Sequence, residues 1–257
     1  MPAAIYKGLE GLPEVRLRSA DALFGSLARL PGAEALPSLE RAGEVADAGF
    51  SKLLASAKVG MAEHELAAEI EYAMRAMGAE DCRFMIARSS QPDIGLPPAG
   101  SATLVTGEAI LVVMAASYQR YWVELGQTLC LGRVSQEVVA GHKSATALFR
   151  RFAEGLTAGA DPQFTNRCLE ESGVSAAERR SIIAYGAGNG IGLDLVEKPL
   201  LGVDRGVTIR DGMVLTLRVC LQGRQCGSAL ISRPYRVTSR GLELLVSEGE
   251  ELVTVAA

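Results

Sequence analysis

The chain has 257 residues, of which 48% are hydrophobic and 22% are charged. This length is sufficient for one large domain with a sizeable core, and the charged fraction is ordinary for a globular protein. The net charge is −4 and the arginines are scattered, so nothing favours a nucleic-acid partner. The longest strongly apolar stretch, residues 109–116, is far shorter than the roughly 18 residues of a membrane span, so we expect no membrane partner.

The N-terminus and the cysteines bear on the compartment. The first residues lack the apolar core of a signal peptide. Five cysteines, an odd number without C-x-x-C pairing, indicate reduced thiols in a cytoplasmic protein. Cys220 and Cys226 could face each other across a hairpin, although two buried apolar thiols is the interpretation that we favour. The remaining cysteines are Cys82, Cys130 and Cys168.

Hydrophobic periodicity predicts helices and strands in a repeated order. The first 35 residues are expected to be irregular except for a short helix over 21–30. Helices are then followed by strands twice, which indicates a weak internal duplication and an α+β domain with antiparallel strands. The predicted helices cover residues 38–57, 62–77, 135–155 and 163–172, and the predicted strands cover residues 83–87, 109–116, 118–130, 213–221, 228–237 and 252–255.

A glycine-rich segment, Gly186 to Gly192, nearly spells the turn that binds dinucleotides in short-chain dehydrogenases. That turn opens the first of several βαβ units. Only 65 residues follow position 192 in this chain of 257, and they have strand patterns. The context therefore excludes a dehydrogenase, and we expect no cofactor.

A different resemblance fits these glycines and their surroundings. Gly188-Asn189-Gly190-Ile191-Gly192-Leu193-Asp194-Leu195-Val196-Glu197-Lys198-Pro199 resembles the Gly-His-Gly-Ile-Gly-Leu-x-x-His-Glu-x-Pro signature of peptidase family M24, which includes aminopeptidase P, prolidase and creatinase. Further segments resemble family motifs in the right order, namely 60–68, 107–112, 118–121, 212–216 and 237–244. The resemblance implies a pita-bread fold with two duplicated halves around a curved antiparallel sheet. It implies a pita-bread domain over residues 37–257, preceded by a short extension, 1–36, in place of a large N-terminal domain.

The resemblance also implies where a metal site would lie, and the ligands are missing there. Family peptidases bind two metal ions through two Asp, one His and two Glu, with a bridging water as nucleophile. In chain order these positions fall on Val113, Glu124, Asn189, Arg218 and Ser232. Valine cannot bind a metal and arginine repels one. We therefore expect no metal and no metallopeptidase activity.

Creatinase, a metal-free relative, implies a second kind of site, which is also incomplete. The family's loop histidine falls on Pro98, and the histidine before Glu-x-Pro falls on Val196. The two histidines present, His64 and His142, are expected to be solvated surface residues. Without a histidine, acid–base catalysis would need a shifted Glu or Cys.

Three functions follow from the resemblance. The first is an inactive domain, in which the former cleft binds a peptide or a small carboxylate or amide ligand, with a homodimer as a further assembly. The second is a metal-independent enzyme, and the third is a genuine Xaa-Pro peptidase. Arg218 and Glu124 could form a structural ion pair, or Arg218 could bind an anion. Catalytic candidates are Glu124, Glu197 and Arg218, and ligand-binding candidates are Pro98, Tyr121, Asn189, Val196, Glu197 and Arg218.

Overall fold

The computed structural model describes residues 2–90, 95–223, 227–247 and 249–256. Its helices are α1 (Ala3–Glu10), α2 (Asp21–Ala28), α3 (Leu36–Ser56), α4 (Glu63–Ala76), α5 (Gln136–Gly155), α6 (Phe164–Glu171) and α7 (Ala176–Tyr185). Its strands are β1 (Asp81–Arg88), β2 (Ala109–Tyr118), β3 (Tyr121–Leu131), β4 (Gly188–Gly190), β5 (Glu197–Leu200), β6 (Val214–Gly223), β7 (Gly227–Thr238), β8 (Gly241–Leu244) and β9 (Val253–Val255). In these described ranges, no helix combines the length and apolarity needed to cross a membrane.

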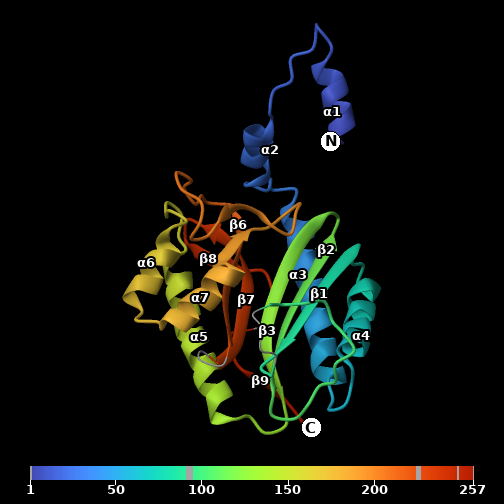
Figure 1. The fold of residues 1–257 in the computed structure, drawn as a ribbon, viewed down its shortest axis with the longest axis vertical. Helices are drawn as coiled ribbons and strands as arrows, with labels where there is room; N and C mark the ends of the chain where they lie inside the picture. Colours follow the sequence, from blue (N-terminus) through green and yellow to red (C-terminus); the bar gives the residue numbers. More distant parts are fainter. Residues whose placement is uncertain (1, 91–94, 224–226, 248, 257) are drawn as a thin grey trace.

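All of these strands belong to one sheet, in the order β1-β2-β3-β7-β6-β4-β5, with β8 on β7 and β9 on β3 (Figure 1). Every pairing is antiparallel except that of β9 with β3. The two halves meet where β3 pairs with β7, at Gly126 and Ser232. The predicted α+β class with antiparallel strands is therefore confirmed.

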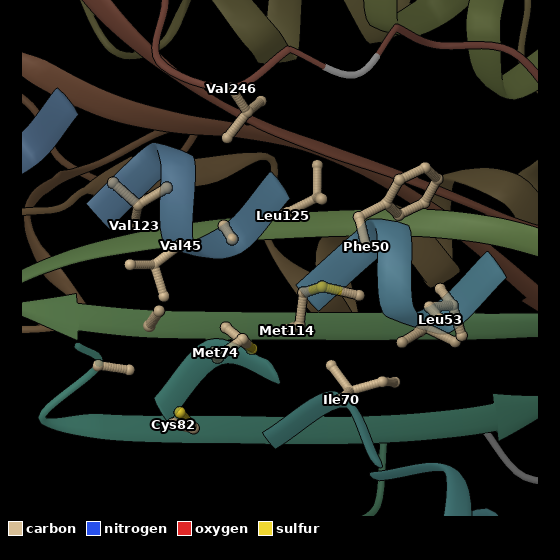
Figure 2. Close-up of a cluster of buried hydrophobic side chains, with 14 of the residues drawn as sticks. Val45, Phe50, Leu53, Ile70, Met74, Cys82, Met114, Val123, Leu125 and Val246 are labelled. Carbon is tan, nitrogen blue, oxygen red and sulfur yellow. The ribbon is translucent and has the colours of Figure 1, made fainter. Parts of the chain in front are cut away.

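Alternation along the strands divides the sheet into a helix face and an open face. On β6, the odd-numbered residues from Leu215 to Leu221 pack with α5 and α6, and on β2 the even-numbered residues from Ile110 to Ala116 pack with α3 and α4. The register places these two sets on the same side of the sheet. Figure 2 shows part of the first cluster, with Phe50 and Met74 among its members. The other face carries polar side chains, among them Glu124 and Arg218, and a smaller apolar cluster that includes Val113.

Capping residues define the starts of two helices. The Ser135 hydroxyl accepts a hydrogen bond from the Val138 amide at 3.2 Å and so begins α5. Ser175 and Glu178 form a reciprocal capping box at the start of α7. Sequence analysis did not assign α7, although Ser-x-x-Glu is a recognisable start signal. It also left α1 irregular, and the structure corrects this because residues 3–10 are helical.

The buried thiols of Cys82 and Cys130 are not arranged for reactivity. Burial raises the pKa of Cys82 and of Cys130 to about 11, so both stay protonated near neutral pH. Cys220 lies on β6 opposite Leu230 of β7, within an apolar cluster. Cys226 lies outside the described residues, so the expected placement of this pair stays a prediction.

Helix α3 approaches the chain after β8 so closely that position 43 has no room for a side chain. A β-carbon at Gly43 would lie 1.8 Å from the carbonyl oxygen of Leu245. We predict that Gly43→Ala lowers the free energy of unfolding by about 2 kcal/mol or more, since both elements must shift. Urea denaturation would measure this. In the control Gly25→Ala, the nearest atom is 3.9 Å away, so an equal loss there would contradict the explanation.

His142 is buried, and its expected place on the surface is wrong. Only 6% of it is exposed, and Nε2 has no partner among the described residues. Burial lowers the pKa of His142, and Arg233 acts in the same direction whereas Glu250 opposes it. The residue lies in the stripe of α5 that faces the sheet, with Val138 and Phe149.

The lowered pKa predicts how stability depends on pH. Above the ordinary value of about 6.5, His142 is neutral in both states and has no effect. As pH falls below it, the unfolded chain takes up a proton that the folded chain resists, so stability is lost until the folded-state pKa is passed. We expect His142→Gln to reduce the slope between pH 6.5 and 5, by at most about 1.4 kcal/mol per pH unit. Urea titrations of both proteins would measure it, and equal slopes would contradict it.

Candidate functional site

Four strands bring the former ligand positions to the open face of the sheet. Val113 pairs with Gly126, Gly126 with Ser232, and Ser232 with Arg218, so one row crosses β2, β3, β7 and β6. Glu124 precedes Gly126 by two residues and therefore shares its face. Asn189 on β4 pairs with Thr216, two residues from Arg218. The five positions carried over from the family lie together where the halves of the sheet join.

Glu124 and Arg218 form a buried ion pair at the centre of this row. The Nε and Nη2 atoms of Arg218 donate to Oε1 of Glu124 at 3.1 and 2.6 Å. The hydroxyl of Ser232 donates to the same oxygen at 2.6 Å. The exposed fractions of the two side chains are 13% for Arg218 and 4% for Glu124. Each charge is thus neutralised within the protein, as burial requires.

The surroundings of Val113 are apolar. It packs in a cluster with Leu111, Leu230 and Cys220, and Leu96 and Tyr185 lie against this cluster from outside the sheet. Where the family pattern has a carboxylate, this chain has Val113, which belongs to an apolar cluster. Valine at this position therefore offers no ligand atom, and its neighbours are apolar.

Asn189 and Thr216 supply the neighbouring polar groups. Nδ2 of Asn189 donates to the carbonyl oxygens of Gly190 at 2.7 Å and Leu195 at 3.2 Å. These bonds hold the loop that follows β4 rather than the ion pair. Thr216 is fully buried, and its hydroxyl has no partner in the part of the chain that the structure describes. Sequence analysis did not select Thr216, although alternation on β6 places it on the open face with Arg218.

Val196 and Glu197 lie apart from the ion pair, at a surface hollow of about 480 Å³ between α2 and residues 193–198. Val196 is 60% exposed. The Glu197 carboxylate accepts a bond from the Asp194 amide at 2.9 Å. Burial raises the pKa of Glu197, which the amide bond partly offsets. Among the candidate site residues, Glu197 is therefore one whose pKa is raised by its surroundings.

Two other candidates do not reach the ion pair. Tyr121 lies an odd number of residues from Glu124 on β3 and packs against the core under α3 and α4. Its selection as a cleft residue is therefore wrong, because it faces the opposite side of the sheet. Pro98 is exposed and forms a bridge with Met85 of β1. It belongs to a loop along that edge strand.

Tyr185 is a residue that sequence reasoning missed. Its carbonyl oxygen accepts a bond from Nη1 of Arg218 at 3.1 Å, so the C-terminal end of α7 is tied to the ion pair. Its hydroxyl donates to Oε1 of Gln222, which also accepts a bond from the Gly95 amide at 3.1 Å. Burial raises the pKa of the Tyr185 phenol above its ordinary range. No motif indicates this contact, because only the docking of α7 creates it.

The residues present do not fit the two-metal site of the family peptidases. Oε1 of Glu124, the one surviving carboxylate, already accepts three hydrogen bonds. The guanidinium of Arg218 would repel a divalent cation. Among the residues described, no three His, Cys, Asp or Glu side chains are grouped so that they could hold a metal ion. The side chains at these positions therefore suit an arginine rather than a metal ion.

Comparison with known sequences identifies peptidase relatives. The chain is 24% identical over 229 residues to a protein named "Uncharacterized peptidase YqhT" from Bacillus subtilis. The alignment covers 87% of this chain and 64% of that protein. It is 24% identical over 221 residues to a Xaa-Pro dipeptidase from Pyrococcus horikoshii. This alignment covers 84% of this chain and 62% of that protein. The chain thus spans less than two thirds of the length of these relatives.

Comparison with solved structures gives the fold. The dipeptidase PepE from Mycobacterium ulcerans superposes with a TM-score of 0.87 at 20% identity, over 100% of this chain and 70% of that chain. The prolidase from Pyrococcus horikoshii gives 0.86 at 20% identity, over 98% and 74%. The predicted pita-bread fold is confirmed by these neighbours.

The family itself is shown by a match that covers most of the chain. The family model of metallopeptidase family M24 matches residues 37–239. This range includes every strand that contributes to the row of former ligand positions. The chain therefore belongs to metallopeptidase family M24.

Proposed function

We propose that this chain is a metal-free member of the M24 family that does not hydrolyse peptides and instead binds a peptide or a small carboxylate- or amide-bearing ligand in the former cleft. The observation that carries the proposal is the guanidinium of Arg218, which lies at a family metal-ligand position and donates twice to Glu124. An arginine there supplies the positive charge that a metal would otherwise bring, without a Lewis-acidic centre or an activated water.

The polar groups left over around the ion pair support ligand binding. Arg218 uses Nε, Nη1 and Nη2 for the contacts described above, and a guanidinium carries five N–H donors. The Thr216 hydroxyl is buried without a partner among the residues that the structure describes, and such groups are usually satisfied by a water or a ligand. An oxygen-bearing ligand would satisfy both groups. Carboxylates and amides provide such oxygens.

A metal-independent enzyme is the second candidate, and Glu197 is the observation that favours it. The raised pKa of its carboxyl brings it closer to the range in which a general acid operates. Neither of the two histidines supports it. His64, on α4, is hydrogen-bonded to the carbonyl oxygen of Gly100 at 2.9 Å. His142 is one of the buried residues of α5. If Glu197→Gln abolished a measured turnover of a small amide while the fold persisted, this candidate would replace the first.

The cysteines bear on the compartment in which the domain works. The structure describes four free cysteines, Cys82, Cys130, Cys168 and Cys220. Thiols of this kind suit a reducing compartment, which supports a cytoplasmic location for the domain.

Metal content and peptidase activity test the proposal directly. We expect protein purified without chelator to contain well below one equivalent of divalent metal by elemental analysis. We expect no hydrolysis of Ala-Pro or Gly-Pro when Mn²⁺ or Co²⁺ is added, since the site offers one carboxylate that is already paired. Stoichiometric metal together with Xaa-Pro cleavage would show that the chain is a genuine peptidase.

Thr216→Val tests the binding half. The substitution removes, at nearly constant volume, a buried hydroxyl that has no partner in the described ranges, so we expect an unchanged or raised melting temperature. We expect it to weaken binding of Ala-Pro or of a small carboxylate several-fold in calorimetric titration. Thr254→Val, at an exposed position of β9, is the matched control. Equal affinity in both variants, or no binding by the parent, would remove the cleft as a ligand site.

The ion pair itself predicts a pattern of stabilities. Arg218→Met leaves Glu124 charged and buried, so we expect a loss of about 3–5 kcal/mol in the free energy of unfolding. Combining it with Glu124→Gln removes the unpaired charge, and we expect most of that loss to be recovered. Denaturation of the two single variants and the double variant forms a mutant cycle. Additive losses in the double variant would mean that the pair is not coupled.

A further inference from the structure

Helix α2 borders two cavities at one end of the sheet (Figure 1). The larger cavity is the hollow of about 480 Å³ between α2 and residues 193–198. The smaller cavity, of about 160 Å³, lies between the end of α2 and residues 206–213. Arg29 lines both of them. Because the two cavities share this side chain, a single ligand can occupy both.

The larger hollow suits an apolar group. Its apolar walls are formed by Phe24, Leu27, Leu193 and Val196. The exposed fractions of these four residues range from 49% for Leu193 to 69% for Phe24. Apolar surface that is open to water gains free energy when it is covered. The volume also falls within the range of roughly 300–1,000 Å³ that is usual for small-molecule sites.

The smaller cavity is cationic. Its polar lining residues are Arg29, Arg210, Ser26 and Thr208, and no acidic residue is among its described lining residues. Neither arginine side chain makes an ion pair within the described ranges. Two guanidinium groups without a carboxylate give a recess a positive potential, which attracts an anion.

The guanidinium of Arg29 has an unused donor. Its Nε atom is buried and has no hydrogen-bond partner among the described residues. Its Nη2 atom lies near Gly25, one helical turn earlier, because a β-carbon added at Gly25 would be 3.9 Å from it. A buried N–H group usually has an acceptor in a water or a ligand. The acceptor that a guanidinium fits best is a carboxylate or phosphate oxygen.

The acidic residues of the larger hollow determine which way such a ligand would lie. Asp194 and Glu197 belong to the wall opposite α2, and the Glu197 carboxylate already accepts a hydrogen bond from the Asp194 amide. Lys198 in the same wall is paired with Asp204 at 3.8 Å. An anion is disfavoured beside two carboxylates. The charged group of a ligand therefore belongs at Arg29, in the smaller cavity.

We propose that the two cavities form one binding site for an amphipathic anion. Its apolar chain or ring occupies the larger hollow, and its carboxylate or phosphate group lies between Arg29 and Arg210 in the smaller cavity. The site is separate from the pair of Glu124 and Arg218, so it does not depend on the function proposed for the cleft. Apolar walls with a few convergent polar groups are the usual composition of a small-molecule site.

Equilibrium dialysis of the full chain with octanoate tests the site. We expect saturable binding with a Kd of about 1 mM or tighter, as the small size of this probe allows. We expect octanol, acetate and inorganic phosphate each to bind about 10-fold more weakly or less, because each lacks one half of the required chemistry. Octyl phosphate is the second anionic probe, and the tighter of the two anions identifies the charged group.

Substitutions in each cavity test the two halves separately. We expect Arg29→Gln and Arg210→Gln each to weaken octanoate binding about 10-fold, since each removes a charged hydrogen-bond donor. We expect Leu27→Asp, at a 65% exposed position of the hollow, to weaken octanoate and octanol alike. Circular dichroism should show an unchanged fold in all three variants. Arg180→Gln, at an exposed position of α7, is the matched control and should bind octanoate as the parent does.

Three results would overturn the proposal. The first is no binding of octanoate or octyl phosphate up to about 10 mM, well above the Kd expected from ligand size. The second is equal affinity for octanoate and octanol, which would mean that the arginines do not hold the charged group. The third is octanoate binding that both glutamine variants leave intact, which would place the ligand elsewhere on the protein.

Discussion

The buried pair of Glu124 and Arg218 determines what the centre of this protein can be. Two opposite charges at 2.6 Å, both shielded from water, must stay together, because either one alone would be very costly in the interior. The pair also connects three strands and a helix. Glu124 lies on β3, Arg218 on β6, Ser232 of β7 donates to the shared oxygen, and the end of α7 accepts from the guanidinium. The ion pair thus joins the two halves of the sheet at positions that the family pattern gives to metal ligands.

The two faces of the sheet explain how the fold persists while the site differs. Side chains on the helix face form two large apolar clusters under α3–α4 and α5–α6. Side chains on the open face alternate with them along each strand and point to the opposite side of the sheet. Substitutions such as valine or arginine at ligand positions therefore change the chemistry of the open face and leave the packing of the helix face intact. Membership in the M24 family and the loss of its ligands are compatible for this reason.

The hollow beside α2 and the open face of the sheet are neighbouring features that share one loop. Residues 193–198 follow β4, whose Asn189 holds the carbonyl oxygen of Leu195. The same residues form a wall of the hollow beside α2. The loop after β4 therefore connects the hollow to the open face of the sheet.

Much of this protein was determined by local sequence. Apolar patterning predicted six of the nine strands that the structure describes, all but β4, β5 and β8. Ordered motifs such as 188–199 predicted the family positions, because these patterns depend on residues close together in the chain. The same local patterns also indicate three features that the sequence predictions did not include or placed wrongly. The odd spacing of Tyr121 and Glu124 puts them on opposite faces, the stripe of α5 includes His142, and Ser175 with Glu178 starts α7. Only the tertiary structure decided that Arg218 pairs with Glu124 and with Tyr185. It also decided that, among the described residues, the Thr216 hydroxyl has no partner and no residue of α1 is buried. These facts depend on residues 33 or 94 positions apart meeting, or failing to meet, in space, and no local pattern encodes such contacts.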